Sequence, residues 1–257
     1  MTGAPRAARA LSFGGISEHY DRFRPPPPAE VADWLLPARA RRVADVCAGT
    51  GSFSRVLARR VAEVVAVDLD PRMLAVLRDR SPAPAAVRAS GDALPFRDGA
   101  LDAVLVSSGW HWLNPERAVP EIARVLRPGG VLGVVWNGPD RSVDWVGDLF
   151  QHRYRPDDLP APSRRALSIP DGQPFTAPGH RVIDSTLPRT RAELLGLAGT
   201  YSRVITSGPA EQEDELRRAG AMVDGLPAVP GEDRIDLPMR AYCWKAERTA
   251  GPSPPAG

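Results

Sequence analysis

Lysine and cysteine are nearly missing from this sequence. Lys245 is the single lysine, and the remaining 32 of the 33 basic residues are arginine. The codon usage of a GC-rich genome explains this bias, so an individual arginine is not by itself a sign of function. The two cysteines, Cys47 and Cys243, fall in predicted strands and form neither a metal-ligand spacing nor a disulfide framework. We therefore expect a reducing compartment and no metal site.

An excess of one charge and long apolar runs are also missing. The 33 basic and 31 acidic residues give a net charge of +2, and no basic block or tail stands out. Nucleic acid and an anionic membrane are therefore not the expected partners. The first residues, MTGAPRAARAL, lack the apolar core of a signal peptide, and no apolar run approaches the length of a membrane span. We expect a soluble cytoplasmic protein, as a monomer or a homodimer.

The 257 residues are enough for one well-cored domain with an elaboration, or for two small domains. The first half alternates short apolar strands with helices, which predicts a parallel sheet covered on both faces. The strands are expected at 43–47, 64–68, 86–89, 101–108 and 131–137, and the helices at 29–36, 52–60, 71–79 and 115–126. Beyond residue 140 we expect a helix at 142–151, a long irregular stretch, a strand at 181–187, helices at 190–198 and 210–222, and a last strand at 237–245.

The stretch VADVCAGTGSFS, residues 43–54, predicts a strand, a glycine turn and a helix. Gly49 and Gly51 let a backbone approach a ligand closely, although glycines also punctuate many ordinary turns of this kind. A dinucleotide site needs a third glycine, and Ser54 stands there instead. Cys47 stands where the first glycine is usual. The turn therefore argues against a pyrophosphate.

Two acidic residues extend the comparison of ligands. Asp68 ends the second predicted strand, where a carboxylate accepts hydrogen bonds from both hydroxyls of a ribose. Asp92, in GDALPF, stands where a carboxylate accepts from an adenine amino group, a feature that dinucleotide enzymes do not need. Each aspartate has a plainer alternative as a cap of a helix or turn. Together they favour an adenosine-type cofactor over a nicotinamide dinucleotide.

The segments VADVCAGTG, VVAVDLDPRML, GDALPFRDGALDAV and EIARVLRPGGVLGVVWN resemble the four signature motifs of class I S-adenosylmethionine-dependent methyltransferases, in the family's order and spacing. The chain is most similar to the small-molecule branch of ubiquinone/menaquinone and trans-aconitate methyltransferases. The resemblance covers residues 12–137 and extends to residue 246. It departs at Cys47, which strains the turn but leaves both following glycines.

This resemblance implies an α/β fold with a Rossmann-like seven-stranded sheet, whose last strand is antiparallel. It also implies a helical N-terminal lid and a small cap insertion. The implied segments are a lid at 1–30, an S-adenosylmethionine-binding core at 31–137, the cap and remaining core helices at 138–235, the last strand at 236–248 and a disordered tail at 249–257.

S-adenosylmethionine is the cofactor that the resemblance implies. Carried over residue by residue, the cofactor contacts are Gly49, Thr50 and Gly51 at the methionine part, Asp68 at the ribose, Leu69 and Met73 near the adenine, Asp92 and Ala93 at the adenine edge, Ser107 beside the sulfonium or the amino acid tail, and Arg24 at the cofactor carboxylate.

His111 is the best candidate for a general base, because it follows the fourth strand where the family's pocket opens. Its alternative role is a packed histidine that fixes the loop between Trp110 and Trp112. His19 and Tyr20 form a second candidate group in the lid, where Tyr20 is expected to orient the acceptor or the cofactor.

The expected function is methyl transfer to a small organic molecule, a biosynthetic or secondary metabolite, recognised by residues 12–30, 138–180 and 190–222. Two alternatives stay open. An S-adenosylmethionine-binding cyclase or regulator keeps the same cofactor motifs, and a nicotinamide oxidoreductase shares the strand–glycine–helix–acid pattern.

Overall fold

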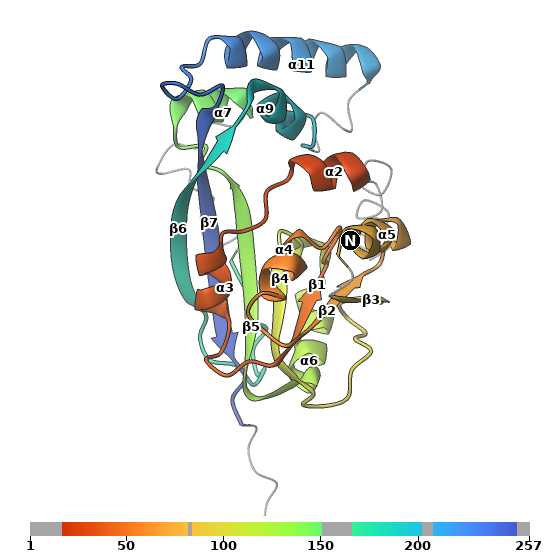
Figure 1. Cartoon of the computed structure of the whole chain (residues 1–257). Helices are drawn as coiled ribbons and strands as arrows, with labels where there is room; N and C mark the ends of the chain where they lie inside the picture. The colour runs from red at the N-terminus through yellow and green to blue at the C-terminus, as the bar shows by residue number, and fades with distance from the viewer. Residues whose placement is uncertain (1–16, 82–83, 151–165, 202–207, 251–257) are drawn as a thin grey trace, which may run out of the picture.

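The computed structural model describes residues 17–81, 84–150, 166–201 and 208–250. Seven strands form one sheet in the order β3-β2-β1-β4-β5-β7-β6 (Figure 1). The strands β1 to β5 are parallel to one another, and β7 is antiparallel to both β5 and β6. This confirms the predicted α/β sheet with its antiparallel last strand. The strands are β1 (Arg42–Val46), β2 (Glu63–Asp68), β3 (Ala85–Arg88), β4 (Leu101–Ser107), β5 (Leu126–Pro139), β6 (Gly179–Arg189) and β7 (Ile235–Glu247).

Helices cover both faces of the sheet, as the continuous apolar strands predict. The buried side chains of α3 and α4 share one apolar cluster with one face, and those of α6 share another cluster with the opposite face. Among the described residues, no helix is both long and apolar enough to cross a membrane. The helices are α2 (Ser17–Phe23), α3 (Ala29–Leu35), α4 (Ser52–Leu57), α5 (Pro71–Arg80), the 3₁₀ helix η2 (Trp110–Trp112), α6 (Pro115–Val125), α7 (Asp144–Leu149), α9 (Arg191–Ala198) and α11 (Pro209–Asp224).

Local signals in the sequence explain several helix starts. Proline occupies the first turn of α5 and of α6, where its missing N–H costs nothing. The side chains of Asp70 and Asn114 cap these two helices by accepting from backbone N–H groups. In α9, Thr190 and Glu193 form a reciprocal capping box.

The strands β5, β6 and β7 are longer than the sequence predicts, and they carry the cap. Pairing of β5 begins at Leu126, opposite Leu101, and ends at Pro139, opposite Met239. The helices α7, α9 and α11 gather at one end of these strands (Figure 1). They enclose a separate apolar cluster that includes Phe150 and Leu197. The predicted segment boundaries themselves stay a prediction.

The lid helix α2 contacts both the cap and the core. On the cap side, the Phe23 ring occupies the space that a Cβ at Gly196 would need, since the two would be 2.3 Å apart. On the core side, Asp21 accepts a hydrogen bond of 2.8 Å from Arg55 of α4. Arg55 also donates to the carbonyl of Thr50, at 2.9 Å. One guanidinium therefore joins the lid to the glycine turn.

Candidate active site

The glycine turn follows β1 and is built from left-handed residues. The φ angles of Cys47, Gly49 and Gly51 are 59°, 56° and 78°. A Cβ at Gly51 would lie 2.5 Å from Cδ1 of Leu77, so that position excludes a side chain. A Cβ at Gly49 would meet no atom within 4 Å, while Thr50 is buried between the two glycines. The turn therefore presents bare backbone to open space, as a closely bound ligand requires.

Asp68 connects this turn to the end of β2. One carboxylate oxygen accepts from the backbone N–H of Gly49 at 2.8 Å, and the other accepts from that of Asp70 at 2.9 Å. Burial raises the pKa of Asp68, and these two N–H groups oppose the shift. The next residue, Leu69, leaves 39% of its surface exposed, whereas Met73 is buried. An acid and an exposed apolar side chain thus flank the turn.

Asp92 and Ala93 lie in the turn that follows β3. The hydroxyl of Ser90 donates to one carboxylate oxygen of Asp92, and Arg117 of α6 approaches the other at 3.2 Å. The N–H of Ala93 donates to the carbonyl of Ser90 at 3.1 Å. The Asp92 carboxylate is therefore held in one orientation at the same edge of the sheet.

His111 lies in η2, just beyond the end of β4 at Ser107. Its side chain is exposed, and its ring centroid lies 4.1 Å from that of Trp112 and 5.1 Å from that of Trp136 in β5. Trp110 is only 5% exposed and packs in the core. The exposed imidazole fits an accessible base better than a packed core histidine, and its catalytic role stays a prediction.

The lid candidates lie against the cap in this structure. The ring of His19 stacks near Phe23 with centroids 4.7 Å apart. Arg24 donates from Nε to the hydroxyl of Thr200 at 2.9 Å, and its guanidinium lies 4.0 Å above the ring of Tyr201. The backbone of Tyr20 lies in α2, and its side chain falls outside the described part of the chain. The described contacts of Arg24 are therefore with the cap, and its role at a cofactor carboxylate stays a prediction.

Asp45 is a residue that the sequence reasoning missed. It is fully buried in β1 and accepts a hydrogen bond of 2.6 Å from the hydroxyl of Ser54. Within the described part of the chain, its second oxygen has no hydrogen-bond partner. Burial raises the pKa of Asp45 to about 7. The sequence does contain a signal for Asp45: an acidic residue lies inside an apolar strand, and Ser54 stands in place of the third glycine.

The side chain of Cys47, which stands where a glycine is usual, packs against Gly109. A Cβ at Gly109 would lie 2.4 Å from Cβ of Cys47, so the glycine after β4 makes room for this side chain. Burial and the carboxylates of Asp68 and Asp45 raise the pKa of the Cys47 thiol. The thiol therefore stays protonated at neutral pH and is no nucleophile.

Comparisons with known proteins identify the family. The family model described as a methyltransferase domain matches residues 44–134. A protein of Mycobacterium tuberculosis, described as an uncharacterised methyltransferase, is 40% identical over 241 residues, which is 94% of this chain and 97% of the relative. A demethylmenaquinone methyltransferase of Thermus thermophilus is 39% identical over 186 residues, which is 62% of this chain and 81% of the relative.

A solved structure extends the agreement to the fold. A candidate type II methyltransferase from Anaeromyxobacter dehalogenans superposes with a TM-score of 0.64 at 25% identity, covering 88% of this chain and 98% of that chain. The glycine turn with open space before it, the Asp68 carboxylate and the exposed Leu69 fit an adenosine cofactor whose methionine part lies against the turn. The chain belongs to the class I S-adenosylmethionine-dependent methyltransferases, and S-adenosylmethionine is its cofactor.

Proposed function

We propose that this chain transfers a methyl group from S-adenosylmethionine to a small organic molecule. One observation carries the proposal. The carboxylate of Asp68 is hydrogen-bonded to the backbone N–H of Gly49, at the same edge of the sheet where the exposed His111 follows β4. Ligands of open parallel sheets bind at this carboxyl edge. A cofactor cradle and a candidate base therefore lie at one edge of one sheet.

The candidate site residues have separate roles in this proposal. Asp68 holds the ribose, Gly49 and Gly51 let the backbone approach the methionine part, Leu69 contacts the adenine, and Asp92 meets its amino edge. When bound, S-adenosylmethionine supplies an electrophilic methyl group on its sulfonium sulfur. Positioning and exclusion of water supply most of the acceleration of such a displacement. The lid and cap above this edge suit the exclusion of water.

His111 removes a proton when the acceptor is a phenol, an alcohol or a carbon acid. A neutral imidazole is the side chain that most often accepts such a proton in catalysis. The rings of Trp112 and Trp136 hold the imidazole in place through their tilted contacts. Its exposure leaves a path for an acceptor to reach it.

Two observations support a small acceptor. The net charge is only +2 and the sequence has no block of basic residues, which disfavours a nucleic-acid substrate. The name of the Thermus thermophilus relative gives demethylmenaquinone, a small molecule, as its substrate. We therefore propose a biosynthetic or secondary metabolite as the acceptor, with the protein acting in the cytoplasm as a monomer or homodimer.

Calorimetry with S-adenosylhomocysteine tests the cofactor assignment. Asp68→Ala is expected to weaken binding at least tenfold, because the ribose loses its acceptor and the turn loses the bond to Gly49. Asp33→Ala is the matched control, since Asp33 is exposed and pairs only with Arg60 in the described contacts. Absence of binding by the unaltered protein contradicts the proposed function, and equal affinities for both variants contradict the ribose assignment.

Transfer itself needs a second experiment, because a cyclase or a regulator would also bind the cofactor. The protein is incubated with methyl-labelled S-adenosylmethionine and a panel of phenols, amines and enolisable carboxylic acids, and products are analysed by mass spectrometry. A labelled methyl product together with S-adenosylhomocysteine supports transfer. Cofactor binding without any turnover across the panel and a cell extract favours the regulator or the cyclase. Competition by NADH for the site favours the nicotinamide alternative.

A further inference from the structure

The helix α6 carries a polar stripe that faces the loop of residues 92–98. The stripe consists of Arg117, Glu121 and Arg124, whose spacing of four and three residues puts all three side chains on one face of the helix. The opposite, apolar side of α6 packs on the sheet through residues such as Val119 and Ile122. A helix anchored on the core therefore presents three charged groups to one loop.

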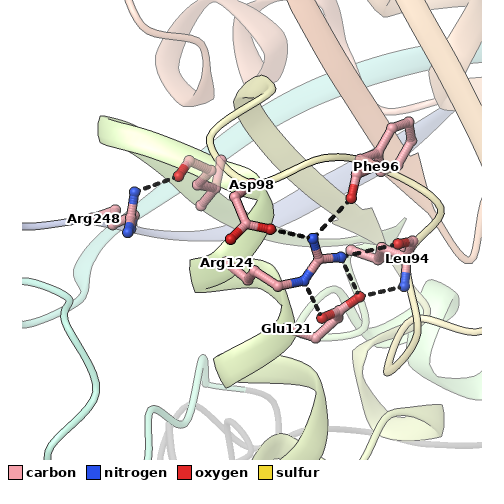
Figure 2. A network of polar contacts seen from close by, with 7 residues as sticks. Leu94, Phe96, Asp98, Glu121, Arg124 and Arg248 are labelled. Atoms are coloured by element: carbon pink, nitrogen blue, oxygen red, sulfur yellow. Dashed lines mark hydrogen bonds and ion pairs between the residues drawn. The ribbon is translucent and has the colours of Figure 1, made fainter.

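Arg124 and Glu121 hold the second half of this loop (Figure 2). Glu121 accepts from the backbone N–H of Leu94 at 2.7 Å, and Arg124 donates to the carbonyl of Leu94 at 3.2 Å. Arg124 also donates to the carbonyl of Phe96 at 2.8 Å and to the carboxylate of Asp98 at 2.7 Å. The backbone N–H and the carbonyl of Leu94 are thus both hydrogen-bonded to side chains of α6.

The two stripe residues also bind one another. Arg124 donates to both carboxylate oxygens of Glu121 at 2.8 Å. These bonds lower the pKa of Glu121, so it stays ionised near neutral pH. A bidentate pair of this kind restricts both side chains and keeps the remaining donors of Arg124 aimed at the loop.

The other end of the stripe reaches the residue assigned to adenine. Arg117 approaches a carboxylate oxygen of Asp92 at 3.2 Å. Leu94, which α6 holds, lies two residues further on, and its side chain is only 4% exposed. The position of the Asp92 carboxylate therefore depends on bonds from one helix at both ends of a short loop.

We propose that Glu121 and Arg124 are positioning residues that determine how well this chain recognises the adenine of its cofactor, by fixing the loop that carries Asp92 and Ala93. The inference rests on the proposed function, and it assigns these residues no contact with the cofactor. Their effect is expected at the adenine end alone, because the glycine turn and Asp68, to which the proposed function assigns the rest of the cofactor, are joined to each other by a separate bond and not to this loop.

Two probes separate this role from a general loss of stability. S-adenosylhomocysteine contains adenine, ribose and homocysteine, and S-ribosylhomocysteine lacks only the adenine. Affinities are measured by calorimetry and by competition, at a temperature well below the unfolding transition of each variant. For Arg124→Met we expect affinity for S-adenosylhomocysteine to fall at least tenfold, and affinity for S-ribosylhomocysteine to change less than twofold.

Two further variants keep the test decisive. Arg124→Lys restores the charge without the fork and is expected to recover part of the loss; it serves as the measurement if Arg124→Met does not fold. Arg127→Met is the matched control, because in the described contacts Arg127 pairs with Asp102 and donates to the carbonyl of Pro128, outside the loop. Equal losses for both probes, or no loss for either, overturn the inference. Failure of the unaltered protein to bind S-adenosylhomocysteine contradicts the proposed function instead.

Discussion

Gly109→Ala is expected to destabilise the fold through a single clash with Cys47. The backbone of Gly109 has φ −112° and ψ −10°, which alanine adopts without strain, so only the added methyl matters. That methyl would lie 2.4 Å from Cβ and 3.2 Å from Sγ of Cys47, whereas carbon atoms in contact prefer about 3.5–4.0 Å. A Cβ cannot rotate away, so the strand ends must separate. Overpacking of this kind costs about 1–3 kcal/mol.

Cys47→Gly is expected to cancel most of this cost. The substitution removes the clashing atoms and relieves a left-handed φ of 59°, a strain of about 1 kcal/mol. It also gives the unfolded chain more freedom, which costs about 0.5–1 kcal/mol, so the single variant is close to neutral. In the double variant the methyl at Gly109 occupies the space that Cys47 vacates.

The measurement is urea unfolding of the four proteins, followed by circular dichroism and intrinsic fluorescence. We expect a coupling free energy of about 1–3 kcal/mol between the two positions, against about 0.5 kcal/mol or less for independent sites. Additive effects refute the reasoning, because they mean that Gly109 does not exist to accommodate the side chain at 47. A suitable control pair is Gly208→Ala with Cys47→Gly, since the backbone of Gly208 has φ −67° and a Cβ there would meet nothing within 4 Å.

Three other changes have expected outcomes. Asp45 holds a proton to about pH 7 when folded but only to about pH 4 when unfolded, so its contribution to the free energy of unfolding falls by roughly 4 kcal/mol as the pH rises through that window. Asp45→Asn is expected to remove this fall in urea titrations at pH 5 and pH 8; an unchanged pH dependence contradicts the buried acid. His111→Ala is expected to lower kcat with a phenolic or enolisable acceptor, and a drop under about threefold favours the packing role. Arg55→Met removes the bonds that Arg55 donates to the carboxylate of Asp21 and to the carbonyl of Thr50. It should speed dissociation of S-adenosylhomocysteine several-fold in stopped-flow experiments; an unchanged rate means that this link does not retain the cofactor.

The sequence by itself was sufficient to predict the parallel sheet and to bring Gly49, Gly51 and Asp68 together at one of its edges. Apolar runs such as 64–68 and 101–108 predict buried parallel strands, because such strands are covered on both faces and need no alternation. Proline and capping residues mark helix starts at 71 and 115, since these signals act within one turn. Gly49 and Gly51 follow β1 and Asp68 ends β2, and these two strands run side by side, so the convergence of the three residues at one edge follows from the topology.

Only the tertiary structure decided how distant residues complete one another. The extra length of β5, β6 and β7 comes from pairing between residues far apart in the sequence, such as Pro139 with Met239 and Arg189 with Ile235, which no local pattern encodes. Arg124 and Leu94 are 30 residues apart, and their bond depends on how α6 lies on the sheet. The same holds for Cys47, which the sequence presents as a strained substitute for glycine. Its side chain fits because Gly109, 62 positions later, leaves space for it, and space between strands is a property of packing rather than of either segment.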